Sequence, residues 1–204
     1  TRRAVIHAYN VVSAEYFEKL SDRMTPAAII PMHHPEEAIA ELEFATKQLG
    51  SKVGMFGSAF PRQVPALADG PAEAKKFTVN YEVFGIDSPY DYDPVWAKCR
   101  DVKIAPTFHS TGSNQALRNS PSNFVYNHIG HFADAGHAAC KGIFLGGITR
   151  RFPELRWAFL EGGVGWAAQL FGDLMEHWER RNLRALDNMK PDKLDRQLLM
   201  SLTE

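Results

Sequence analysis

Residues 151–163 read RFPELRWAFLEGG, an apolar run that ends abruptly in a carboxylate and two glycines. The segment from Trp157 to Leu160 is too short for a helix, and its unbroken apolarity is typical of a strand covered on both faces, as in parallel α/β sheets. Glu161 then follows the carboxyl end of the strand, which is the edge that carries chemistry in barrels and open parallel sheets. The two glycines after it permit a sharp turn or a close approach of the backbone to a ligand. This stretch therefore predicts an α/β fold with a functional side chain at a strand end.

Outward from this stretch, short apolar runs alternate with amphipathic helices, the order expected of βα units. Strands are predicted at residues 27–31, 53–57, 102–108 and 157–160, and helices at 5–20, 35–49, 93–99, 123–150, 166–178 and 191–202. Within the helical residues 123–150 we expect an interruption near Gly136, and we expect Asp93 to be an N-cap before Pro94. Residues 61–92 show little periodicity, which predicts either a functional loop or lid, or a plain surface insertion.

The composition is that of an ordinary globular domain: 204 residues, 45% apolar and 23% charged, which we interpret as a single domain over residues 1–204. A net charge of −1 provides no basic field for nucleic acid or an anionic membrane. No apolar stretch approaches the roughly 18 to 20 residues that span a bilayer, and the first residues lack a signal-peptide core, so a cytoplasmic enzyme is expected. Cys99 and Cys140 lie far apart in predicted helices and are expected to be packing residues without a disulfide.

Two predicted strand ends carry side chains suited to chemistry. His109 follows the third strand, where a neutral imidazole is a good ligand for a divalent metal. Glu161 follows the fourth strand and could act as a metal ligand or as a general base. For each residue taken alone, the alternative is a structural role, as a histidine with satisfied hydrogen bonds or as an ion-paired carboxylate.

Four further histidines are candidate substrate-binding residues. His128 and His131 are three residues apart and would share one face of a helix. His33 and His34 precede Pro35 at another strand-to-helix connection, so they could line the same mouth of the fold. The alternatives are solvated or core-edge positions for the first pair, and a role in the turn and the start of the helix for the second.

Several of these stretches together resemble the amidohydrolase-2 group of metal-dependent TIM-barrel enzymes, which includes aminocarboxymuconate-semialdehyde, resorcylate and carboxyvanillate decarboxylases. The matching stretches lie in the family's order between about residues 23 and 180. They are PEEAIAEL at 35–42 with Leu49-Gly50, YDPVW at 92–96, the strand that ends at His109, and GGITRRFPEL at 146–155 running into LEGG at 160–163. The resemblance implies an α/β fold of the (β/α) TIM-barrel type, in which the four predicted strands correspond to strands three to six.

The resemblance also implies roles for the site residues. His109 would bind the catalytic divalent metal, with zinc preferred and manganese or iron as alternatives. Glu161 stands where the better-known members carry a histidine active in acid/base chemistry, and a carboxylate more readily accepts a proton than donates one. The family's first-strand metal ligands have no match before Ala27, and its terminal aspartate has none after Trp178. Since a TIM barrel usually needs about 250 residues, we expect an incomplete barrel that binds metal weakly or not at all.

Three alternative functions follow from the resemblance. The first is a metal-dependent hydrolase acting on a carboxylated small molecule, with metal-activated water and Glu161 as proton acceptor. The second is a non-oxidative decarboxylase of an aromatic or dienoic acid. The third, from another class, is a non-catalytic barrel remnant with an incomplete metal site. Apolar surface at residues 61–92 and 166–178 further predicts self-association into a homo-oligomer.

Overall fold

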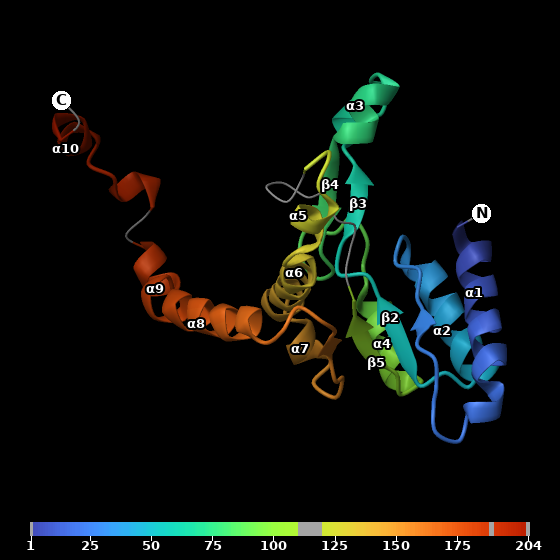
Figure 1. The fold of residues 1–204 in the computed structure, drawn as a ribbon. Coiled ribbons are helices and arrows are strands. Elements are labelled where there is room, and N and C mark those ends of the chain that lie inside the picture. The colour runs from blue at the N-terminus through green and yellow to red at the C-terminus, as the bar shows by residue number, and fades with distance from the viewer. Residues whose placement is uncertain (1, 110–119, 188–189, 203–204) are drawn as a thin grey trace. The chain divides into compact units, whose positions relative to one another are not determined.

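A computed structural model describes residues 2–109, 120–187 and 190–202 (Figure 1). The chain falls into two compact units, Thr1–Gly163 and Val164–Glu204, and each is described by itself. The single domain expected over residues 1–204 stays a prediction. Among the described residues, none of the helices is both long and apolar enough to cross a bilayer.

The first unit contains a four-stranded sheet in which every neighbouring pair is parallel. In spatial order the strands are β1 (Ala28–Ile29), β2 (Val53–Phe56), β5 (Ala105–Phe108) and β6 (Ala158–Phe159). These are the four predicted strands, somewhat shortened, and their parallel arrangement confirms the predicted α/β architecture. Because all four run the same way, their carboxyl ends meet at one edge of the sheet, here called the carboxyl edge.

Two helices cover the sheet as their sequences predict. Helix α2 (Pro35–Lys47) begins with Pro35 in its first turn, and Ala38, Leu42 and Ala45 on its apolar stripe are fully buried. Helix α4 (Asp93–Asp101) packs beside α2 and buries Trp96, whose ring lies 5.8 Å from that of Phe56 on β2. The predicted N-cap is wrong by one position: Asp93 is the first helical residue, and its N–H donates to the Asp91 carboxylate at 2.9 Å.

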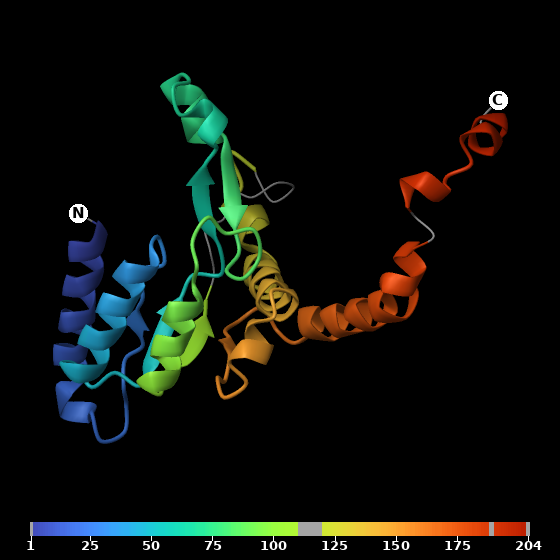
Figure 2. The same cartoon turned by 180° about the vertical axis from the view of Figure 1, so that it is seen from behind.

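Helix α1 (Arg2–Phe17) packs against α2 and β1 (Figures 1 and 2) and continues into a 3₁₀ turn, Glu18–Leu20, which confirms the helix predicted over 5–20. Its one buried residue, Asn10, pairs with the outer strand. The Asn10 amide donates to the Ile29 carbonyl at 3.0 Å and accepts from the Ile29 N–H at 2.8 Å. The side chain thereby supplies hydrogen bonds to the edge of β1.

Residues 61–92, predicted as a functional loop or lid or as a plain surface insertion, contain regular elements that the sequence did not indicate. Strands β3 (Phe60–Gln63) and β4 (Val79–Glu82) form an antiparallel pair, with a 3₁₀ turn at Pro65–Leu67 and helix α3 (Ala72–Phe77) between them. Figures 1 and 2 both show this hairpin projecting from the first unit with α3 near its tip. Strands of four residues, one of which contains a proline, are too short to show a clear alternation of apolar and polar residues. Each residue also pairs with one about twenty positions away, so the local sequence pattern does not reveal the hairpin.

The predicted break near Gly136 is also wrong, because Gly136 is buried inside helix α6 (His131–Leu145). The breaks lie on either side of that helix. Gly130, with φ 76°, separates α6 from α5 (Phe124–His128), and a left-handed Gly147 precedes α7 (Ile148–Arg151). Glycines that adopt positive φ interrupt a helix, whereas a glycine with helical φ only lowers its propensity.

The second unit is helical in its described residues. Helix α8 (Gly165–Arg180) confirms the predicted helix 166–178, although the side chains of Phe171 and Trp178 on its apolar stripe are largely exposed within this unit. The helix predicted over 191–202 is divided into a 3₁₀ turn, Pro191–Lys193, and α10 (Arg196–Ser201), with α9 (Leu183–Leu186) before them. The division lies at Asp195, whose side chain caps α10 by accepting from the Leu198 N–H at 2.9 Å.

Candidate active site at the carboxyl edge

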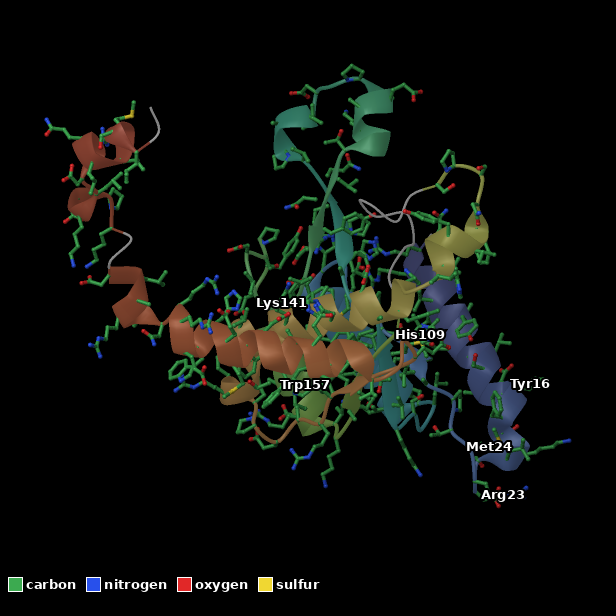
Figure 3. The ribbon with its side chains drawn as sticks, turned by 60° about the vertical axis from the view of Figure 1, so that its left-hand side comes forward. Tyr16, Arg23, Met24, His109, Lys141 and Trp157 are labelled. Atoms are coloured by element: carbon green, nitrogen blue, oxygen red, sulfur yellow. The ribbon has the colours of Figure 1, made fainter. Side chains whose placement is uncertain are left out.

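His109 and Glu161 meet at the carboxyl edge of the sheet. His109 follows β5 directly, and its N–H donates to the Phe56 carbonyl at 3.2 Å, which fixes its backbone beside β2. Glu161 is the second residue after β6, and His109 Nε2 lies 3.4 Å from Glu161 Oε1. Figure 3 labels His109, and also Trp157, which precedes β6 at its opposite, amino end. Both side chains are partly open to solvent, so the pair is accessible to a small molecule.

The backbone at Glu161 is left-handed, with φ 62°, and Gly162 and Gly163 continue the same conformation at φ 75° and 70°. For a residue with a Cβ this region costs roughly 1–2 kcal/mol. Such conformations persist only where the surrounding structure holds them, and they cluster at functional sites. The surrounding structure therefore holds Glu161 in a conformation that it shares with Asp87 and Lys103.

Phe132, in the first turn of α6, brings three imidazoles together. Its ring centroid lies 5.1 Å from that of His109, 5.3 Å from His128 and 5.0 Å from His131. The prediction that His128 and His131 share one helical face is wrong, since α5 ends at His128 and α6 begins at His131. Their rings are nevertheless 6.4 Å apart, on either side of left-handed Gly130, which separates the two helices. Phe132 is not among the predicted site residues, although its place directly after a histidine in the run HIGHF was a usable signal.

His33 and His34 follow β1, two strands away from β5 in the sheet. His33 packs edge-on against Phe60 of the hairpin with ring centroids 3.9 Å apart, and exposed His34 packs against Tyr90 at 5.0 Å. Burial, reinforced by the nearby Arg2 guanidinium, lowers the pKa of His33 to about 4, so its imidazole is neutral near pH 7. These two histidines contact the hairpin and the segment that follows it, and their predicted role in substrate binding stays a prediction.

Arg62 on β3 ties the hairpin to the loop after β1, an interaction that the sequence did not indicate. Its guanidinium pairs with the buried Glu82 carboxylate, donates to the His33 carbonyl at 2.8 Å, and donates to the Tyr92 hydroxyl at 2.9 Å. The Tyr92 hydroxyl in turn donates to the Met32 carbonyl at 2.6 Å. Burial raises the pKa of Tyr92 above its usual value, which keeps the phenol protonated as a donor. The strand end that carries His33 is thus held by a nearly buried polar network.

The His109–Glu161 pair fits two positions of a metal site. Two ligand atoms, each about 2.1 Å from a tetrahedral ion, lie about 3.4 Å apart, which matches the 3.4 Å between Nε2 and Oε1. A neutral imidazole nitrogen and a carboxylate oxygen are also donors that zinc and manganese accept. Over the described ranges, however, no group of three or more His, Cys, Asp or Glu side chains is placed to hold a metal ion. The described residues therefore supply two ligands of a set that would need more.

Comparison with known proteins points to one family. The family model "Amidohydrolase" matches residues 2–190. No curated protein matches the chain in sequence.

Solved structures similar to this chain include amidohydrolases and decarboxylases. An amidohydrolase from Mycobacterium avium subsp. paratuberculosis K-10 is 22% identical with a TM-score of 0.61, covering 87% of this chain and 42% of its own. A 2,6-dihydroxybenzoate decarboxylase from Rhizobium is 19% identical with a TM-score of 0.57, covering 76% and 44%. A dihydroxybenzoic acid decarboxylase from Polaromonas sp. JS666, with bound manganese and the inhibitor 2-nitroresorcinol, is 17% identical with a TM-score of 0.50, covering 76% and 42%. The likeness confirms the TIM-barrel type of fold, and this chain spans less than half the length of each of these structures.

Proposed function

This chain belongs to the amidohydrolase family, and from that premise we propose that its carboxyl edge contributes to the active site of a metal-dependent hydrolase acting on a carboxylated small molecule. The observation that carries the proposal is the 3.4 Å separation of His109 Nε2 and Glu161 Oε1 at the ends of adjacent parallel strands. The pair brings a histidine and a carboxylate, about fifty residues apart in sequence, to the edge where barrels place their chemistry.

The two residues have different roles in the proposed reaction. His109 offers an imidazole nitrogen as a ligand for a divalent cation, and Glu161 offers a carboxylate that takes up a proton. When bound, a divalent metal would supply Lewis acidity that activates water or polarises the substrate. Zinc and manganese both accept these donors, and manganese is the metal bound in the decarboxylase from Polaromonas.

Phe132 with His128 and His131 provides a surface for the organic part of the substrate. An aromatic ring packs favourably on Phe132, and the two imidazoles can donate hydrogen bonds to a carboxylate. His33 and His34 are proposed at the margin of the same edge, next to the hairpin. Chemistry of this kind favours a planar, carboxylated substrate.

Non-oxidative decarboxylation is the second candidate, favoured by the activities named for the similar structures from Rhizobium and Polaromonas. It requires a proton to be delivered to carbon as carbon dioxide leaves, whereas hydrolysis requires a proton to be taken from water. Glu161 suits the second task better as a carboxylate, and the first only when protonated. The products of turnover separate the two, since decarboxylation releases carbon dioxide and hydrolysis does not.

We expect two substitutions in the natural protein, purified with its metal, to separate the two roles. Glu161→Gln keeps the shape of the side chain but removes the proton acceptor, so turnover of a dihydroxybenzoate or of its amide or ester is lost while metal remains bound. His109→Ala instead lowers the metal content, measured by elemental analysis. Unchanged turnover in Glu161→Gln would remove the proposed role, and an unsubstituted protein with neither turnover nor bound metal would favour the non-catalytic remnant.

A further inference from the structure

Gly162, directly after Glu161, lies against the backbone of another element. A Cβ built on it would lie 2.6 Å from Ala133 N, 2.8 Å from Ala133 Cα and 2.9 Å from Phe132 C. These three atoms belong to the backbone of the first turn of α6, which cannot rotate aside as a flexible side chain can. Only a glycine fits between the end of β6 and this helix.

The same turn of α6 also reaches the other member of the pair. Phe132 contacts the His109 ring with a centroid separation of 5.1 Å, while the backbone of Phe132 and Ala133 receives Gly162. Glu161 lies between these contacts in its left-handed conformation, with its carboxylate 3.4 Å from His109. One helical turn therefore contacts both strand ends that carry the candidate catalytic pair.

We propose that Gly162 is a positioning residue, which by packing on the first turn of α6 holds Glu161 in its left-handed conformation and sets the distance from its carboxylate to His109. The effect on turnover rests on the proposed function, whereas the effect on the His109–Glu161 distance does not. A side chain at residue 162 would push the loop off α6 and carry Glu161 with it.

Gly163 provides a matched control. Its φ of 70° is close to the 75° of Gly162, so alanine at either residue meets similar left-handed strain. The space differs, because a Cβ on Gly163 would meet nothing within 4 Å. Any difference between Gly162→Ala and Gly163→Ala therefore reports the contact with α6 and not the cost of the backbone conformation.

The test is an NMR double-substitution experiment on the 204-residue chain without added metal. The ring resonances of His109 are recorded before and after Glu161→Gln in three backgrounds: the unsubstituted chain, Gly162→Ala and Gly163→Ala. We expect Glu161→Gln to shift the His109 signals in the unsubstituted chain and in Gly163→Ala, and to shift them several-fold less in Gly162→Ala. An equal response in the two alanine backgrounds overturns the proposal.

A second measurement keeps the proposal testable if Gly162→Ala does not fold. In the unsubstituted chain, a nuclear Overhauser contact is expected between the Gly162 Hα protons and the Ala133 amide proton, together with the strong intraresidue amide–Hα contact of a positive φ at Glu161. Absence of the Gly162–Ala133 contact overturns the proposal.

Turnover in the natural protein then links position to function. A misplacement of about 1 Å can cost on the order of 100-fold in rate. We therefore expect the turnover rate of Gly162→Ala to be about 100-fold lower than that of Gly163→Ala. If Glu161→Gln leaves turnover unchanged, the proposed function fails while the NMR comparison still decides the role of Gly162. If Glu161→Gln abolishes turnover and the two alanine variants are alike, Gly162 has no positioning role and the proposed function stands.

Discussion

At the scale of single residues, the partly buried His33 makes the stability of the fold depend on pH. Its folded pKa of about 4 lies below the ordinary value of 6.5. Between these values the unfolded chain binds a proton at His33 and the folded chain does not, so the free energy of unfolding decreases as the pH is lowered from about 6.5 towards about 4. The full stabilisation is present above the pKa of His33 in the unfolded chain. It is lost as the pH falls through the pKa of His33 in the folded chain.

We expect His33→Gln to flatten this part of the stability profile, because the substituted side chain does not titrate. Urea unfolding of the chain at several pH values between about 4 and 7 measures the slope. His34→Gln is the matched control, since it removes the exposed neighbour and leaves His33 in place. A slope in His33→Gln as steep as in the unsubstituted chain would show that other groups cause it.

Cys99 illustrates a residue whose structural role could be inferred from its type. It is fully buried on α4, and burial raises the pKa of its thiol to about 12, so the reactive thiolate is suppressed. Cys140 on α6 is partly buried, and both cysteines are free. The prediction that they are packing residues without a disulfide is confirmed.

At the scale of elements, an ion pair between Arg62 on β3 and Glu82 on β4 joins the two strands of the hairpin. The side chain of Glu82 is only 3% exposed, and Arg62 joins it to the loop after β1. Removing one partner of such a pair leaves an uncompensated buried charge and costs about 3–5 kcal/mol. Arg62 therefore stabilises the hairpin and also links it to the loop after β1.

We expect Arg62→Met to reduce the free energy of unfolding by about 3–5 kcal/mol and to detach the hairpin from the loop that carries His33. Adding Glu82→Leu to that variant should restore much of the loss, because the unpaired carboxylate is gone. Urea unfolding of the two single variants and the double variant measures the coupling. Arg23→Met is the surface control, since Arg23 and Asp22 are about 70% exposed and such pairs contribute at most about 1 kcal/mol. Equal losses for Arg62→Met and Arg23→Met would contradict the assignment.

At the scale of the whole molecule, metal binding depends on how many ligands the chain brings together. The described residues supply the His109–Glu161 pair, and within them no group of three ligands is found. Since a stable tetrahedral site uses four donors, we expect the 204-residue chain to bind zinc or manganese weakly. Elemental analysis after exhaustive dialysis measures the metal content of the chain. Zinc at near-stoichiometric occupancy would contradict the expectation. Self-association through the apolar stripe of α8 also stays a prediction. Analytical ultracentrifugation, which measures sedimentation, tests the oligomeric state of the chain.

Much of the fold was predictable from local pattern. The four apolar runs in the sequence correspond to the four parallel strands. The apolar residues Ala38, Leu42 and Ala45 of α2 are buried, as their helical spacing predicts. The hairpin was not predictable, because β3 and β4 are short and pair across an intervening helix. The site was predictable in its strand ends, His109 and Glu161, but not in Phe132 or Arg62, whose contacts join segments remote in sequence.

The sequence by itself determined the order of βα units and the presence of a histidine and a carboxylate after two of the strands. Both follow from short-range physics: runs of apolar residues, helical periodicity and the residues that end each run. Only the tertiary structure decided that His109 and Glu161 lie 3.4 Å apart, that left-handed Gly130 separates His128 from His131, and that Gly162 packs on α6. Those features depend on strand register and on the close approach of two backbones, which arise when distant segments pack and leave no periodic trace in the chain.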